Sequence, residues 1–337
     1  MVFVTGGTGL LGTHLLLDLT LKGESVRALK RAKSNLDQVL SVFEYYQGKV
    51  EGKKLFESIE WITGDVLDII SLQNGIAGCT RVFHCAALVS FVKRDFKKMM
   101  KINKYGTANV VNVCLDSQVE QLVYVSSTAA IGRDASKKMY EESNKWVNSN
   151  DNSNYAVTKY LAENEVWRGV EEGLDAVIVN PCVILGPGNW NESSLSIFKV
   201  VKKGLKFYTP GGNAFVDARD VVSSMITLSE RGHVNERFLV ISENLPFKTL
   251  FESIADTFKV KAPSIETKKW MAEIAWRIEG ALRFLFGKKQ NITKETARAA
   301  MKTTFYSNEK IKAKIGIEFR PVNEAVANAI DYFNQQN

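Results

Sequence analysis

Apolar residues along the first 185 positions follow two alternating patterns. Short apolar runs, typical of buried strands, alternate with longer segments in which apolar residues recur at the spacing of a helix face. The runs predict strands at 2–4, 25–29, 59–63, 81–85, 122–125 and 176–180. The segments between them predict helices at 10–19, 35–47, about 70–72, 91–116 and from about 153. Such alternation is typical of a parallel sheet with helices on both faces, so the sequence predicts a doubly wound α/β Rossmann fold.

The alternation ends at Gly186-Pro187-Gly188, and a more aromatic, more helical region follows. We expect the segment 215–219, a helix at 221–228 and a strand at 237–241 to return to the main sheet. Helices are predicted at 250–258, 268–286, 294–303, 308–315 and 323–333. The prediction is therefore of two unequal lobes. Residues 1–181 and about 213–242 form the larger one, and about 182–212 with 243–337 form a smaller, mainly helical lobe.

The turn after the first predicted strand has glycines at positions 6, 9 and 12. Gly6 permits a backbone conformation that a side chain would forbid, Gly9 lets the backbone approach a phosphate, and Gly12 lets the helix pack closely on the strand. The N-terminus of the following helix presents free N–H groups and a positive dipole end. A dinucleotide is therefore expected to bind here, with the larger lobe as the NAD(P)-binding domain.

The second predicted strand ends in Lys30-Arg31. In dinucleotide folds an acidic residue at this position accepts hydrogen bonds from the adenosine ribose, whereas a basic residue suits a 2′-phosphate. We therefore predict NADP(H), with NAD as the alternative. Asp65, at the end of the third strand, is placed to meet the adenine edge. Ala86-Ala87, at the end of the fourth, leave room for a cofactor.

Three further polar residues are candidates for chemistry. Ser127 ends the fifth predicted strand, where side chains point into the ligand crevice. Tyr155 and Lys159 lie four residues apart and so share one helix face. His84, inside the fourth strand, is expected to be a packed residue and not a catalyst.

Composition narrows the class of protein. The chain has 337 residues, of which 45% are hydrophobic and 24% charged, as in globular enzymes. The four cysteines are far apart, so we expect reduced thiols and no metal site. No signal peptide precedes the first strand and no apolar run reaches membrane-spanning length, which predicts a soluble, cytoplasmic protein. The net charge of +7 is spread over the chain without a nucleic-acid-binding module, so no nucleic-acid partner is expected. The densest basic cluster, between Lys93 and Lys104, is predicted to face solvent.

Taken together, these motifs resemble those of the extended short-chain dehydrogenase/reductase family, which includes NAD-dependent epimerases and dehydratases. The resemblance covers almost the whole chain. The segments that carry it are Thr5 to Gly12, Gly64 to Val66, Ala86-Ala87, Tyr155 to Lys159 and Phe215 to Asp220.

The family resemblance implies catalytic roles for Ser127, Tyr155 and Lys159. Reduction of a ketone creates an alkoxide that must be protonated, and Tyr155 would supply that proton. Lys159 would favour the phenolate and hold the nicotinamide ribose, while Ser127 would bind the substrate oxygen. The implied cofactor-binding residues are Gly6, Thr8, Gly9, Leu10, Leu11, Gly12, Lys30, Arg31, Asp65, Val66, Ala86, Ala87, Asn103, Tyr155, Lys159, Pro181 and Val183. A homodimer pairing helices 91–116 and 153–173 is also implied.

Several functions remain open within this family. A sugar-nucleotide dehydratase is disfavoured, because Ala129-Ala130 stand where an Asp-Glu pair is expected. A nucleotide-sugar 4-epimerase is less favoured, because Lys30-Arg31 replace the acid. We favour a ketone, aldehyde or alcohol oxidoreductase with a small, apolar substrate, since the segment 180–188 resembles the dihydroflavonol reductase and 3β-hydroxysteroid dehydrogenase branches. A catalytically silent, cofactor-binding regulatory protein is a third interpretation, which the intact Ser127, Tyr155 and Lys159 disfavour.

The segment 268–289 predicts an unusually aromatic helix whose charged residues exclude a bilayer span. The favoured interpretation is that it packs on the smaller lobe. The alternative is that Trp276 and Phe284 help to roof the substrate cleft while Lys288 and Lys289 rest against a membrane.

Overall fold

The central sheet of the computed structural model has seven parallel strands in the order β3-β2-β1-β4-β5-β6-β10. The structure describes all residues except 134–136, 138, 150–151, 191–192, 287–292 and 337. The strands are β1 Val2–Thr5, β2 Val26–Lys30, β3 Glu60–Thr63, β4 Arg81–His84, β5 Gln121–Val125, β6 Ala176–Pro181 and β10 Glu236–Val240. The chain order reverses between β1 and β4, where ligands bind in such sheets. The predicted Rossmann fold is confirmed.

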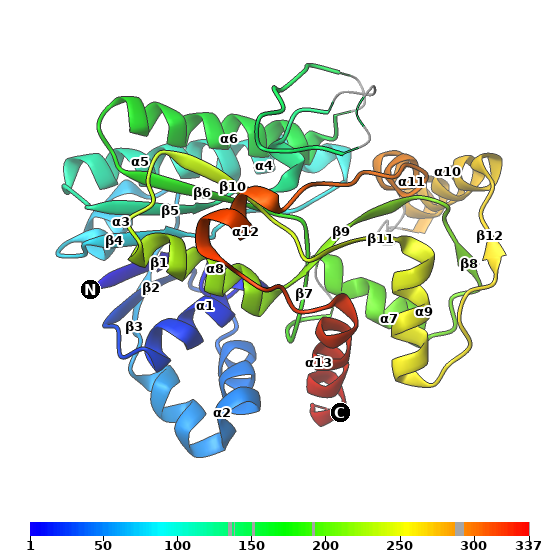
Figure 1. Ribbon diagram of the computed structural model, residues 1–337, viewed down its shortest axis with the longest axis horizontal. Coiled ribbons are helices and arrows are strands. Elements are labelled where there is room, and N and C mark those ends of the chain that lie inside the picture. The colour runs from blue at the N-terminus through cyan, green and yellow to red at the C-terminus, as the bar shows by residue number, and fades with distance from the viewer. Residues whose placement is uncertain (134–136, 138, 150–151, 191–192, 287–292, 337) are drawn as a thin grey trace.

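Helices cover both faces of this sheet (Figure 1). One layer consists of α3 Ile69–Ile76, α5 Gly106–Asp116 and α6 Asn154–Glu171, and its apolar side chains pack with Phe3 and Val82 of the strands. The other consists of α1 Leu10–Leu21, α2 Asp37–Glu57, α8 Ala218–Glu230 and α12 Glu309–Ile315, which pack with Val4 and Val177. Burial on both faces explains why the strands read as short, continuous apolar runs.

The helix predicted over 91–116 is wrong in its first part. Residues 91–92 are not helical, because the Ser90 hydroxyl accepts the Val92 N–H (3.2 Å) and bonds to Asp95 (2.7 Å), which competes with helix formation. A 3₁₀ turn, Lys93–Asp95, then leads through α4, Phe96–Met99, into a π-helical stretch, Met100–Tyr105, before α5. The basic residues of this segment are exposed as predicted, except Lys104, which is half-buried beside Glu165.

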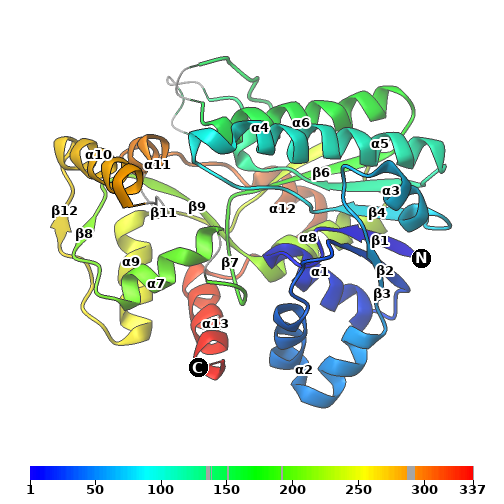
Figure 2. The same cartoon turned by 180° about the vertical axis from the view of Figure 1, so that it is seen from behind.

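A second region of the chain lies beyond the carboxyl ends of the strands (Figures 1 and 2). It contains a sheet of β7 Val183–Leu185, β9 Gly212–Asp217 and β11 Glu243–Pro246, and a strand pair of β8 Phe207–Tyr208 and β12 Ile265–Glu266. Its helices are α7 Ser196–Lys202, α9 Phe247–Phe258, α10 Lys269–Phe286, α11 Lys294–Ala300 and α13 Val322–Gln335, and a 3₁₀ turn, Ser193–Leu195, directly precedes α7. Another 3₁₀ turn, Thr128–Ala130, follows β5 of the main sheet.

The expectation that the segment 215–219 joins the main sheet as a strand is wrong. This segment belongs to β9, which pairs with β7 and β11. Helix α8 follows β9 at once and packs on α1, so that β10 and not β9 takes the edge position beside β6. The predictions that the helix 221–228 and the strand 237–241 rejoin the main sheet are confirmed. The division of the chain into two lobes remains a prediction.

Trp190 lies at the centre of the second region's apolar core. Its side chain is only 3% exposed and stacks on Phe333, with ring centroids 3.8 Å apart, and on Phe198 at 5.0 Å. Phe258 meets it edge-on at 5.7 Å. Because these rings come from four separate segments of the chain, Trp190 joins the loop after β7 to α7, α9 and α13.

We expect Trp190→Ala to lower the free energy of unfolding by about 3 to 5 kcal/mol, because it removes a large buried side chain and leaves a cavity. Urea denaturation followed by circular dichroism measures this. Trp270→Ala is the matched control, since Trp270 is 62% exposed and its removal should change stability by no more than about 0.5 kcal/mol. Equal losses in the two variants would contradict the central position of Trp190.

Candidate active site

The glycine-rich turn lies between β1 and α1, at the reversal of strand order. Gly6 has φ +72°, and a Cβ there would lie 2.6 Å from the backbone nitrogen of Ala86. A Cβ on Gly12 would lie 2.1 Å from the Gly6 carbonyl oxygen, so neither position accepts a side chain. Gly9, the N-cap residue of α1, has no side chain with which to cap the helix. The turn therefore offers uncapped N–H groups at close approach, which fits the pyrophosphate of a dinucleotide.

The predicted cofactor-binding residues around this turn differ in how far their side chains are exposed. Leu11 is buried in the core, so only its main chain can face a phosphate, whereas Thr8 and Leu10 are half-buried. At the end of β2 the Lys30 carbonyl accepts the Gly64 N–H at 2.9 Å. Neither Lys30 nor Arg31 forms an ion pair with a residue that the structure describes, and Arg31 is exposed. Both cations are thus available to an added phosphate.

Hydrogen bonds hold the loop that follows β3, and small residues follow β4. Asp65 accepts the Leu67 N–H at 3.0 Å, which fixes the loop after β3, and the Val66 carbonyl accepts a bond from Asn109 at 3.0 Å. Ala86, half-buried, packs against Gly6, while Ala87 is exposed. These small residues leave open the edge of the sheet next to the glycine turn.

Ser127 and Tyr155 are brought together by the end of β5 and the first turn of α6. The Ser127 oxygen accepts the Ala129 N–H at 3.1 Å, and Ser153 caps α6 by accepting the Ala156 N–H at 3.1 Å. Burial raises the pKa of Tyr155 to about 12, while its hydrogen bond with Ser127 acts in the opposite direction. Tyr155 is therefore protonated at neutral pH and can act as an acid.

Lys159 is buried one helical turn below Tyr155, as the four-residue spacing predicts. Its Nζ donates to the Tyr124 hydroxyl at 2.7 Å and to the Val125 carbonyl at 2.9 Å. Burial lowers the pKa of Lys159 to about 7, and the negative charge of Glu163 opposes this by raising it. The lysine thus titrates near neutral pH.

His84 is packed, as expected, and links β1 to the lysine. The ring is fully buried, hydrogen-bonds to Thr5 at 2.6 Å and Thr107 at 3.0 Å, and stacks on Tyr124. Burial and the nearby charge of Lys159 lower the pKa of His84 to about 3, so the ring is neutral. A continuous buried polar chain therefore runs from the strand before the glycine turn to the partner of Lys159.

Asn103, from the π-helical stretch, holds the loop after β4 against α6. Its Oδ1 accepts the Leu88 N–H at 2.7 Å, and its Nδ2 donates to the Leu88 carbonyl and to Thr158, both at 3.0 Å. Pro181, at the end of β6, is buried, and Val183, in β7, is half-buried. These positions border the site without taking part in hydrogen bonds to Ser127 or Tyr155.

Glu163 is a site residue that the sequence reasoning missed. Its carboxylate is 2% exposed and accepts hydrogen bonds from Ser126 at 2.5 Å, Asn180 at 2.8 Å and Arg237 at 2.8 Å. Asn180 also donates to the Ser127 carbonyl at 3.0 Å. Glu163 could have been found from the sequence, because it lies four residues after Lys159 and so shares its helix face. Arg237 could not, because it is distant in sequence from the helix.

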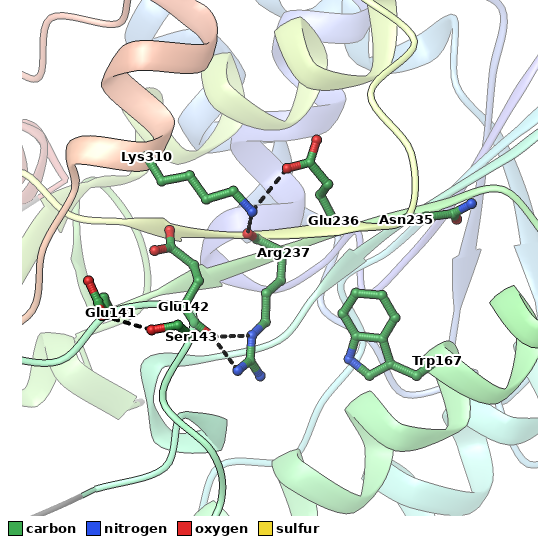
Figure 3. Close-up of a pocket in the computed structure, with 8 residues that line it drawn as sticks. All are labelled: Glu141, Glu142, Ser143, Trp167, Asn235, Glu236, Arg237 and Lys310. Carbon is green, nitrogen blue, oxygen red and sulfur yellow. Dashed lines mark hydrogen bonds and ion pairs between the residues drawn. The ribbon is translucent and has the colours of Figure 1, made fainter.

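The cavity drawn in Figure 3 lies elsewhere, beside the edge strand β10. There Lys310 bonds to the Arg237 carbonyl at 2.9 Å and pairs with Glu236 at 3.0 Å, while the Arg237 guanidinium bonds to the Glu142 carbonyl. A Glu142 side-chain oxygen accepts the Leu239 N–H at 2.8 Å. Its charged groups are already paired, so this cavity is not a second candidate site.

Comparison with known proteins places the chain in a family. The sequence profile of the NAD-dependent epimerase/dehydratase family matches residues 2–240. The chain is 27% identical to a protein named "Putative dihydroflavonol 4-reductase" from Synechocystis sp., over 98% of this chain and 94% of that protein. It is 30% identical to sterol demethylase protein B from Methylococcus capsulatus, over 72% of this chain and 69% of that protein. The crystal structure of gox2253 is similar over 100% of this chain and 98% of the other, with a TM-score of 0.82 and 28% identity.

The chain belongs to the NAD-dependent epimerase/dehydratase family, which confirms the extended short-chain dehydrogenase/reductase resemblance and makes it an NAD(P)-dependent enzyme. Among the residues that the structure describes, no cluster of three or more His, Cys, Asp and Glu side chains is suited to a metal ion. Within the same residues, no helix combines the length and apolarity needed to cross a bilayer. All four cysteines are free thiols.

We expect Glu163→Gln to shift the pH dependence of NADP⁺ binding. Removing the negative charge lowers the pKa of Lys159 further. Because the charged lysine would hold the ribose, affinity is lost as pH rises through that pKa, so the midpoint of the loss moves to lower pH. Fluorescence titration of NADP⁺ at a series of pH values measures the midpoint.

Glu165→Gln is the matched control for this variant. Glu165 lies on the same helix but pairs with Lys104 and Arg168, near the surface. The Glu165→Gln variant should leave the pH midpoint of NADP⁺ binding unchanged. A general loss of stability would weaken binding at every pH without moving the midpoint, so an unmoved midpoint in Glu163→Gln would contradict the role of its charge.

Proposed function

We propose that the protein is an NADP(H)-dependent oxidoreductase that interconverts a ketone or aldehyde and the corresponding alcohol on a small, apolar substrate. The observation that carries this proposal is the pairing of Ser127, at the end of β5, with the half-buried, protonated Tyr155, whose pKa the Ser127 hydroxyl lowers against the raising effect of desolvation, one helical turn from Lys159. The arrangement supplies an acid, a second donor for the substrate oxygen and a cation within one crevice.

Each residue has a distinct role in this reaction. NADP(H), held by the glycine turn, would supply the hydride that reduces the carbonyl carbon, and NADP⁺ would accept it in the reverse direction. In the reducing direction Tyr155 gives its proton to the substrate oxygen, and Ser127 donates a hydrogen bond that stabilises the charge developing there. Lys159 holds the ribose and favours the phenolate that Tyr155 becomes. In the oxidising direction the same proton returns to Tyr155.

The choice of a reductase over other family reactions depends on residues around the pair. Ala129 and Ala130 follow Ser127, so no carboxylate stands there to remove a proton from a neighbouring carbon. The relative named as a dihydroflavonol 4-reductase supports the same choice.

The apolar substrate is supported by a ring beside the proposed acid. Phe91 lies edge-on to Tyr155 with ring centroids 6.0 Å apart. The relative named sterol demethylase protein B is consistent with an apolar ligand. The homodimer and the cytoplasmic location remain predictions.

Tyr155→Phe should retain NADPH binding and lose about 10² to 10⁴ in kcat, because it removes the proton donor and leaves the ring. A panel of ketones and aldehydes, followed by NADPH absorbance, measures turnover. Tyr160→Phe is the matched control, since Tyr160 lies on the same helix and stacks on Trp146 instead. Turnover of a nucleotide sugar without net NADPH consumption would instead indicate an epimerase.

Arg31→Ala should weaken NADPH binding roughly 10- to 100-fold, as expected for losing one or two charge-assisted hydrogen bonds to a phosphate. NADH binding should be unchanged, because NADH lacks the 2′-phosphate. Titration of both cofactors by fluorescence makes the comparison. Arg94→Ala, another exposed arginine, should affect neither cofactor. Tighter binding of NADH than of NADPH by the unmodified enzyme would contradict the proposed preference.

A further inference from the structure

One end of the second region exposes large apolar side chains. Trp270, Ile274 and Ile278 recur every four residues along α10, and their exposed fractions lie between 46% and 62%. Phe207 and Ile265, at 43% and 47%, are paired neighbours in the β8–β12 strand pair that leads into α10. We call these five residues the α10 surface (Figure 2 shows β8, β12 and α10 at one end of the molecule).

The opposite side of α10 is covered. Ala272 is buried, the Trp276 ring lies 5.9 Å from the Lys294 Nζ, and α10 packs against α11. The helix therefore has a packed inner face and an apolar outer face. Soluble proteins rarely expose contiguous apolar area of this kind unless it binds something.

Charge around the α10 surface is positive. Five exposed lysines lie in the segments that carry it: Lys203, Lys206, Lys261, Lys268 and Lys269. None of them forms an ion pair with a residue that the structure describes. Of the nearby acids, Glu273 is paired with Arg277 at 2.8 Å, whereas Glu266 accepts a bond from the neutral Tyr208 hydroxyl, and the five lysines outnumber it. The surface thus combines apolar side chains with unpaired cations.

We propose that the α10 surface docks on an anionic lipid membrane. An amphipathic helix with aromatic and aliphatic residues on one face and lysines beside them lies in the plane of the lipid headgroups. Each lysine near an anionic surface strengthens binding by about fivefold. A second copy of the chain fits less well, because a two-fold interface would bring the five lysines against the same five lysines. Lys288 and Lys289, the lysines suggested by the sequence pattern, lie outside the described residues.

Docking would place the active site close to the lipid. Helix α11, which packs on α10, lies close to the start of α6, because burial raises the pKa of Glu295 on α11 and the nearby Asn154 N–H opposes that rise. The residue after Asn154 is Tyr155. This consequence rests on the proposed function: an apolar carbonyl substrate dissolved in the membrane would enter the site from the docked side.

Co-sedimentation of the full-length protein with vesicles tests the proposal. We expect binding to vesicles of phosphatidylcholine mixed with phosphatidylglycerol, weaker binding to phosphatidylcholine alone, and loss of binding as salt is raised. The double variant Ile274→Asp/Ile278→Asp should lose binding at least tenfold. The double variant Lys268→Gln/Lys269→Gln should lose at least about tenfold, given the attraction per lysine. Val50→Asp, at an 85% exposed position on α2, is the matched control and should bind like the unmodified protein.

Three results would overturn the proposal. The first is equal binding of the aspartate double variant and the unmodified protein, and the second is no binding of either to anionic vesicles. The third is a dimer in sedimentation velocity that the aspartate substitutions dissociate, which would assign the surface to self-association. Circular dichroism of each variant confirms that it is folded. Vesicle binding is measured without turnover, so its failure and the failure of the proposed reaction are separate results.

Discussion

The buried carboxylate of Glu163 holds together the elements on which the candidate active site is built. It accepts hydrogen bonds from the end of β5, from β6 and from β10, while its own helix carries Tyr155 and Lys159. A carboxylate without these donors would be expensive to bury. With them, the strand ends and the catalytic helix have one preferred arrangement. The same charge favours the protonated form of Lys159, so packing and acid–base chemistry depend on one group.

Close backbone approach imposes the second constraint, at the opposite end of the crevice. The positions of Gly6 and Gly12 leave no space for a Cβ, because β1, the loop after β4 and α1 meet there. The buried chain from Thr5 through His84 and Thr107 runs beneath this contact towards Tyr124. The glycine-rich turn and Lys159 are therefore connected through packed and hydrogen-bonded side chains.

Local patterns in the sequence were sufficient for most of the fold and for selecting the residues of the candidate site, whose catalytic roles remain a proposal. The strands of the main sheet are buried on both faces, so their apolar runs were easy to recognise, and Tyr155 and Lys159 were linked by helical spacing alone. The errors concern features set by distant or competing contacts. Ser90 and Asp95 prevent the helix from starting at residue 91, and β9 pairs with β7 and β11 for reasons that its own sequence does not contain. Arg237 reaches Glu163 from a strand 74 residues away, which no spacing rule predicts.

The side chains along β10 have a consequence for how the protein behaves at high concentration. An edge strand presents unpaired N–H and C=O groups that can recruit a strand from another molecule and seed aggregation. Here the Glu142 carboxylate accepts the Leu239 N–H, and Lys310 donates to the Arg237 carbonyl. Just beyond the strand, Asn308 donates to the Ile241 carbonyl at 2.8 Å. These polar caps come from the loop before α6 and from the α12 region, so they form only when the chain is fully folded. The native molecule is thereby protected from sheet extension at this edge, whereas a folding intermediate that lacks either segment is not.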